Sequence, residues 1–196
     1  MTVMSSRMII GFGLLVAGSP VLLGLMERVS PLEIDSLVPG LERLAGELVL
    51  DGALFTGRLV ERYPDGGMRE ASEYLDGLRH GRSKAWFENG AVRYERSYRE
   101  GRKHGEHTGW YAGGAAHFEY RFEDGLSQGN HREWYPDGLP YREFNYVDGQ
   151  ESGAQRMWHA DGTLRANYVI KDGRRFGLIG SKGCVGAGVA VAATGI

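Results

Sequence analysis

Six histidines are the residues of this chain best suited to metal binding or acid–base chemistry: His80, His104, His107, His117, His131 and His159. Imidazole nitrogen is a common metal ligand, and the spacing His104-x-x-His107 would suit one ion. His107 and His131, however, are 24 residues apart in equivalent positions of a repeat. A sheet built from such repeats would separate them by ~10 Å, too far to share a metal. We therefore expect solvated histidines in turns and strands, with metal binding or pH sensing as the alternative.

Carboxylates are numerous, but their positions suit turns and cross-strand ion pairs. Turn motifs contain Asp65, Asp137 and Asp161, and a column on one face of the expected sheet contains Glu95, Glu119 and Glu143. Such an open surface lacks the burial that shifts a carboxyl pKa into a catalytic range. The sequence also has no phosphate-binding loop. We predict a protein that is not an enzyme and that uses no cofactor, metal or small-molecule substrate.

The only cysteine, Cys184, lies two residues after Lys182 in a glycine-rich segment. One cysteine excludes an intrachain disulfide and a cysteine-based zinc site. A nearby ammonium group could lower the pKa of the thiol and make it reactive. We expect no role for Cys184. The alternative is redox chemistry or an intermolecular disulfide, as in an envelope protein that handles metals or thiols.

The elements that position these residues repeat every 24 residues. One glycine series is Gly57, Gly81, Gly105, Gly129, Gly153 and Gly177, and the tryptophans Trp86, Trp110, Trp134 and Trp158 keep the same interval. A period that does not drift over five copies indicates one supersecondary unit stacked in a line. We assign structural roles to these glycines and tryptophans. The tryptophans are expected to pack one unit on the next.

Each repeat contains two turn signals, which predict a β-hairpin. Tyr63-Pro64-Asp65-Gly66 recurs as Tyr135-Pro136-Asp137-Gly138, and Asp76-Gly77 begins a series that ends at Asp172-Gly173. Both favour tight hairpin turns. Such short connections force neighbouring strands to be antiparallel, so the fold class is all-β: an elongated, single-layer antiparallel meander of about ten strands.

Aromatic residues alternate with charged ones along the strand that follows the first turn. This alternation puts aromatics on one face of the sheet and charges on the other. Stacked rings offer rigid contact area for a partner. The predicted binding surface is therefore an aromatic ladder made of Tyr94, Tyr98, Phe118, Tyr120, Phe122, Phe144, Tyr146 and Tyr168.

The unit Gly-x4-Trp-Tyr/Phe-x2-Gly, followed by an aromatic strand and Asp/Glu-Gly-x-x-x-Gly, resembles the MORN repeat. The Trp134-Tyr-Pro-Asp-Gly138 form is similar to the bacterial variant found in YwqK-type antitoxins. The resemblance covers residues 57–176, and Arg62 and His159 depart from it in the first and last units. It implies contacts with proteins and membrane lipids. It also leaves open, as the alternative function, an antitoxin that neutralises a toxin by direct binding.

The N-terminus has the features of a membrane segment. Met8 to Met26 is uncharged, follows Arg7 and precedes Glu27 and Arg28. Its length is close to the ~20 residues that span a bilayer, and the preceding positive charge would keep the N-terminus inside. We expect a single-pass anchor in the inner membrane with the repeats outside the cytoplasm. The small residues Val16-Ala17-Gly18 leave a cleaved signal peptide and secretion as the alternative.

These observations predict four regions: a membrane anchor or signal in residues 1–30, a linker in 31–47, the repeat array in 48–182 and a flexible tail in 183–196. The formal net charge of −2 gives no electrostatic reason to expect nucleic acid as a partner. The function we expect is a non-enzymatic scaffold at the bacterial cell envelope. Its partner would be an unidentified protein, and its anchor would contact the membrane.

Overall fold

The computed structural model describes residues 32–178 of the 196 in the chain. The described chain is all-β and contains these strands: β1 (Glu33–Asp35), β2 (Leu41–Leu44), β3 (Glu47–Leu50), β4 (Ala53–Leu54), β5 (Gly57–Arg62), β6 (Met68–Leu75), β7 (Leu78–Trp86), β8 (Val92–Arg99), β9 (Arg102–Lys103), β10 (Gly105–Trp110), β11 (Ala116–Glu123), β12 (Leu126–Ser127), β13 (Gly129–Trp134), β14 (Pro140–Val147), β15 (Gln150–Trp158), β16 (Leu164–Lys171) and β17 (Arg174–Leu178). Within residues 32–178, no helix is long and apolar enough to cross a membrane. The predicted anchor and tail lie outside the described residues.

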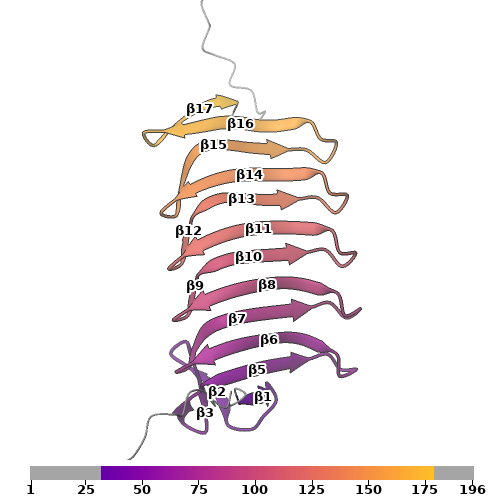
Figure 1. Cartoon of the computed structure of the whole chain (residues 1–196), viewed down its shortest axis with the longest axis vertical. Helices are drawn as coiled ribbons and strands as arrows, with labels where there is room; N and C mark the ends of the chain where they lie inside the picture. The colour runs from indigo at the N-terminus through magenta and orange to yellow at the C-terminus, as the bar shows by residue number, and fades with distance from the viewer. Residues whose placement is uncertain (1–31, 179–196) are drawn as a thin grey trace, which may run out of the picture. The chain divides into compact units, whose positions relative to one another are not determined.

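The main sheet is the predicted antiparallel meander. It has 14 strands, and from β5 to β17 they pair in chain order (Figure 1). The short strands β9 and β12 lie beside this path, where they pair with β8 and β11. The exception to antiparallel pairing is β1, which pairs in parallel with β5 and covers the first edge of the meander.

The Asp-Gly turns have the predicted geometry. Asp124 and Gly125 both have positive φ, 45° and 90°, and the four other turns of this series in the array follow the same pattern. Positive φ at both central residues defines a type I′ turn, whose twist matches that of the flanking strands. Four of these five turns also bond to the preceding repeat or cap, as when Gly125 N–H donates to the carbonyl of Lys103 at 2.8 Å.

The other turn closes each hairpin with a bulge. Gly66 N–H donates to the carbonyl of Tyr63 at 2.9 Å, and Asp65 Oδ1 accepts from Gly67 N–H at 2.9 Å. The pairing of β5 with β6 then shifts by one residue between Glu61 and Arg62. The same shift recurs at the turn end of the later hairpins, so one local design is repeated along the sheet.

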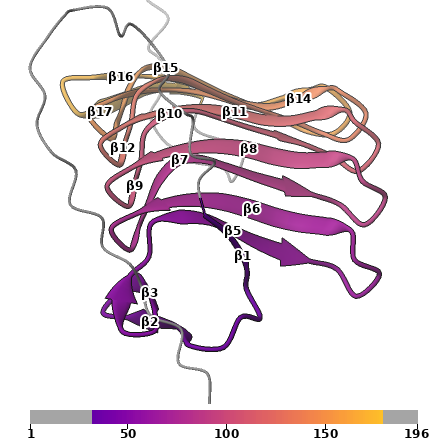
Figure 2. The same ribbon diagram turned by 60° about the horizontal axis from the view of Figure 1, so that its bottom comes forward.

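Residues 31–47, which we expected to be a linker, contain strands instead. β2, β3 and β4 form a small separate sheet that lies at the β5 end of the main sheet (Figure 2). Its Leu48 packs in a buried cluster with Phe55, Leu59 and Tyr74. Pro39 and Gly40 lie in the turn between β1 and β2. This apolar cluster therefore forms a cap on the first repeat.

Candidate functional site

Cross-strand pairs define an aromatic face of the main sheet. Gly109 pairs with both Tyr94 and Phe118, and Gln155 pairs with both Phe144 and Tyr168. Because directly paired residues point to the same side of a sheet, the aromatic face carries all eight residues of the predicted ladder: Tyr94, Tyr98, Phe118, Tyr120, Phe122, Phe144, Tyr146 and Tyr168. The prediction that these residues share one face is confirmed.

Half of this ladder is buried. Tyr94, Phe122, Phe144 and Tyr168 are 5–9% exposed, and the other four rings are half-buried. Rings of successive repeats meet through histidines: the ring centroids of Tyr98 and His107 are 5.5 Å apart, and those of Phe122 and His131 are 5.3 Å apart. The aromatic face therefore forms the core that joins one repeat to the next. Its buried rings offer little contact area to a partner.

Cationic side chains cover several rings of the aromatic face. The guanidinium carbon of Arg96 lies 3.9 Å from the centroid of Tyr94, and Lys103 Nζ lies 4.8 Å from that of Phe122. Arg142 and Arg175 take corresponding places over Phe144 and Tyr168. Cation–π contacts and the apolar stems of these side chains thus shield the rings from water.

His107 and His131 belong to this core, so the expectation of solvated histidines is wrong for these two. His107 is 2% exposed, and its Nε2 lies 2.8 Å from the carbonyl of Ser97. His131 makes the equivalent contact with Arg121. Burial lowers the pKa of His107 to about 4 and also lowers that of His131, because the charged imidazolium would lose its hydration. Both rings are neutral structural groups near pH 7.

Gln155 occupies the next place in this series, which sequence reasoning missed. It is fully buried, and its amide bonds both the N–H and the carbonyl of Asn145 at 3.0 and 2.9 Å. The three side chains at positions 107, 131 and 155 therefore satisfy backbone groups at equivalent positions of three successive repeats. Their 24-residue spacing was the signal that could have identified them.

A second buried polar group lies on the aromatic face. Glu133 accepts hydrogen bonds from the hydroxyl of Tyr120 and from Arg142 Nε, the latter at 2.8 Å. Burial, and then the bond to Glu133, raise the pKa of Tyr120 above that of free tyrosine. All three groups are satisfied by one another, which suits them to a structural role.

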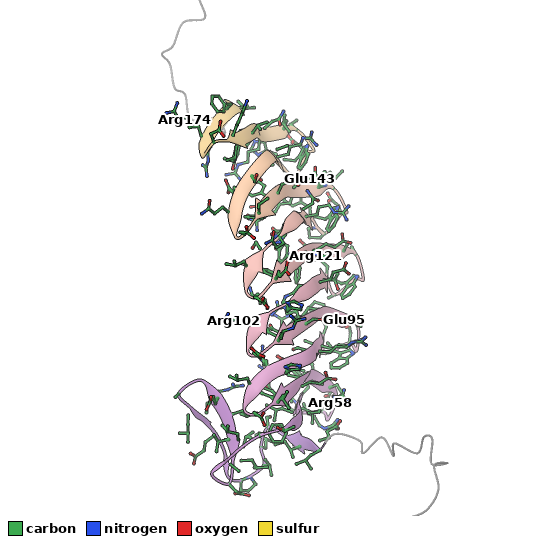
Figure 3. The ribbon with its side chains drawn as sticks, turned by 60° about the vertical axis from the view of Figure 1, so that its left-hand side comes forward. Arg58, Glu95, Arg102, Arg121, Glu143 and Arg174 are labelled. Atoms are coloured by element: carbon green, nitrogen blue, oxygen red, sulfur yellow. The ribbon has the colours of Figure 1, made fainter. Side chains whose placement is uncertain are left out.

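The opposite side, the charged face, holds a row of ion pairs. Lys84 Nζ lies 2.6 Å from Glu95 and Arg132 Nη2 lies 2.6 Å from Glu119, with a further pair of 3.4 Å between Arg156 and Glu143. Glu95, Arg121 and Glu143 are spread along the array, whereas Arg102 and Arg174 lie at its Asp-Gly turn edge (Figure 3). The paired side chains are between one-third and one-half exposed, so this face stays hydrated.

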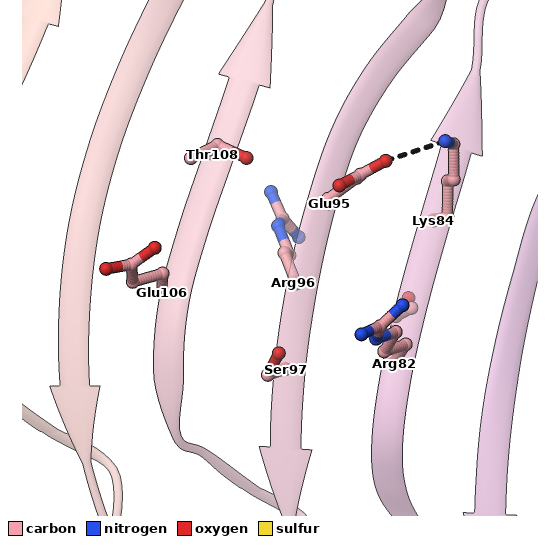
Figure 4. Close-up of a pocket in the computed structure, with 8 residues that line it drawn as sticks. Arg82, Lys84, Glu95, Arg96, Ser97, Glu106 and Thr108 are labelled. Carbon is pink, nitrogen blue, oxygen red and sulfur yellow. Dashed lines mark ion pairs between the residues drawn. The ribbon is translucent and has the colours of Figure 1, made fainter.

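Thr108 interrupts the row of cations. It pairs directly with Glu95 and with Glu119, at the position where three other repeats carry Lys84, Arg132 and Arg156. The shorter side chain leaves two shallow depressions that share Thr108 and Glu106 in their walls. The first has a volume of about 360 Å³. Figure 4 shows the residues that line it, among them the ion pair of Glu95 and Lys84.

The four tryptophans lie beside this row on the charged face, and each is half-buried. Lys84 Nζ is 5.7 Å from the ring centroid of Trp86, and the guanidinium carbon of Arg132 is 5.5 Å from that of Trp134. Contacts between aromatic rings in the described chain involve Tyr, Phe and His but no tryptophan. Ring–ring contacts therefore belong to the aromatic ladder and its histidines, and the packing of one unit on the next by the tryptophans stays a prediction.

Within residues 32–178, no group of three or more His, Cys, Asp or Glu side chains is placed to hold a metal ion. Cys184 lies outside these residues. A scan of protein-family models and a search of curated proteins found no match to the chain.

Proposed function

We propose that the chain is a non-enzymatic repeat scaffold that binds a protein partner along its charged face. The observation that carries this proposal is a difference between the two faces of the sheet. The aromatic face is closed by its own core and covering cations, whereas the charged face presents half-buried tryptophans beside exposed ion pairs. Tryptophan and arginine are, with tyrosine, the side chains that most often dominate protein–protein affinity.

The shape of this surface favours an extended partner over a small molecule. Its two central depressions are shallow, about 360 and 290 Å³, and they follow one another along the sheet. Charged side chains of both signs line them, so a partner can both donate and accept hydrogen bonds. A chain segment laid across successive strands would meet the same chemistry at each repeat.

We place the scaffold at the bacterial cell envelope, as a MORN-type array behind an N-terminal transmembrane anchor. The support is the uncharged stretch from Met8 to Met26, preceded by Arg7, together with the MORN-like repeat unit. A reporter enzyme fused to the C-terminus tests the location. Activity restricted to the outside of the cytoplasmic membrane is expected, and cytoplasmic activity contradicts it.

Two charge reversals test the binding face. Arg121 is exposed on the charged face, and Arg102 is exposed at the turn edge (Figure 3). Partner proteins would be captured from membranes with the full-length chain and identified by mass spectrometry. We expect Arg121→Glu to weaken capture of a specific partner at least tenfold and Arg102→Glu to leave it unchanged. Equal losses in both variants would assign the effect to net charge and contradict the proposal.

A further inference from the structure

The tryptophans of the charged face form a row with a regular step. Trp86, Trp110, Trp134 and Trp158 end strands β7, β10, β13 and β15, and each pairs across the same bulge of its hairpin. These strands alternate with β8, β11 and β14, so successive tryptophans are two strands apart. At ~4.8 Å per strand the step is ~9.6 Å, and the four rings span ~29 Å.

This step decides which chain conformation could contact every ring. A polyproline II helix has three residues per turn and rises ~3.1 Å per residue, so it repeats every ~9.3 Å. Over three steps its mismatch with the row is only ~1 Å. A β-strand presents side chains to one face every ~6.6 Å, and two turns of α-helix advance ~10.8 Å. Both fall out of step with the row by the second or third ring.

The neighbouring side chains suit the polar groups of such a ligand. A polyproline II segment makes no internal hydrogen bonds, so its carbonyls are free to accept from donors. Cations lie two residues before three of the tryptophans, at Lys84, Arg132 and Arg156, and Thr108 takes that place before Trp110. Thr108 is short and lines both depressions, whose walls include no tryptophan, so the room for larger ligand side chains lies beside the row.

We propose that the tryptophan row is a docking site for a proline-rich segment of a partner protein in the polyproline II conformation. Each turn of the ligand contacts one repeat, and about ten residues cover all four rings. This inference rests on the proposed function, because it names the class of partner that the charged face binds.

The test uses the full-length chain and synthetic peptides as probes. Tryptophan fluorescence and calorimetry would measure the binding of a twelve-residue oligoproline, a six-residue oligoproline, a twelve-residue Gly/Ser peptide and a helical alanine-rich peptide. We expect the longer oligoproline to bind at least tenfold more tightly than the shorter one, and the other two to bind more weakly than either. The length dependence needs no protein variant, so a folding defect cannot mimic it.

Two variants locate the site. Trp110→Ala should lower the affinity for the longer oligoproline about tenfold, the loss typical of a central aromatic contact. Tyr146→Ala removes a ring from the aromatic face and should leave that affinity unchanged. Circular dichroism melting would confirm that both variants remain folded.

Equal affinity for the Gly/Ser or helical peptide, or no binding of the longer oligoproline, would overturn the inference. If the partner protein still requires Arg121 in that case, the scaffold function stands and only the class of ligand is wrong. If the longer oligoproline does not bind and capture of the partner protein does not require Arg121, the scaffold function itself is contradicted.

Discussion

The hydroxyl of Tyr111 donates a hydrogen bond of 2.8 Å to the main-chain carbonyl of Trp134 in the next repeat. Tyr63 and Tyr135 make the same bond to Trp86 and Trp158. Residue 87 is a phenylalanine, so the carbonyl of Trp110 lacks this bond. These bonds join three of the four neighbouring pairs of hairpins, and the pair that contains Phe87 and Trp110 has no such bond.

Removing or adding this hydroxyl tests its contribution. We expect Tyr111→Phe to lower the free energy of unfolding by about 1 kcal/mol, the usual net value of one hydrogen bond. Phe87→Tyr should raise it by a similar amount, because it supplies the missing donor. Urea unfolding followed by circular dichroism would show both shifts. Unchanged midpoints in both variants would mean that the bond contributes nothing.

Stability should fall as the pH falls below neutrality. The pKa of His107 is about 4 in the folded chain, below the 6.5 of a free imidazole. The unfolded chain therefore takes up a proton first, and the folded state loses up to ~1.4 kcal/mol per pH unit between pH 6.5 and 4. Stability is complete above pH 6.5. Unfolding midpoints measured from pH 7.5 to 4.5 would reveal this slope.

His107→Gln is the matched control, since glutamine occupies the equivalent position at Gln155. We expect a shallower pH slope in this variant, with the remainder due in part to His131, whose pKa burial also lowers. An unaltered slope would exclude His107 as the titrating group.

Gln155→Leu should be among the most destabilising single changes in the array. It leaves both the N–H and the carbonyl of Asn145 buried without a partner, at a cost of ~1–3 kcal/mol for each. Gln155→His should be milder, because His107 and His131 hold the equivalent carbonyls with one nitrogen. Thermal melts of the two variants would compare them, and equal losses would contradict the assignment.

Two glutamate variants compare the contribution of an exposed ion pair to stability with that of a buried one. Glu143 pairs with Arg156 on the charged face, where both side chains are at least one-third exposed, so Glu143→Gln should cost less than ~1 kcal/mol. Glu133 is 9% exposed and bonded to Tyr120 and Arg142. Glu133→Gln should cost clearly more, because it leaves the guanidinium of Arg142 half-buried beside an uncharged amide. A ranking in the opposite order in chemical denaturation would contradict this description of the two faces.

Much of the fold could be predicted from the sequence because turn chemistry is local. Asp124-Gly125 and Pro64-Asp65-Gly66 specify their turns through backbone conformations that few residues favour, and short connections then determine the pairing order. Strands β1 and β2 were missed. They are short, and their pairing depends on contacts with β5 and β3, which local sequence does not reveal.

The roles of the two faces could not be predicted in the same way. Alternation assigns Tyr94 and Glu95 to opposite sides, but it does not show which side becomes closed. Closure of the aromatic face depends on where the long side chains of Arg96, Lys103 and Arg142 fold back over the rings. The same closure buries His107, which we expected to be solvated.

Photo-cross-linking to the partner tests most directly whether the charged face is the binding surface. A photoreactive phenylalanine analogue would be placed at Thr108 on the charged face, and separately at Tyr146 on the aromatic face, in the full-length chain. We predict that the captured partner cross-links from position 108 and not from position 146. Cross-linking from position 146 alone would contradict the account and return the binding surface to the aromatic ladder.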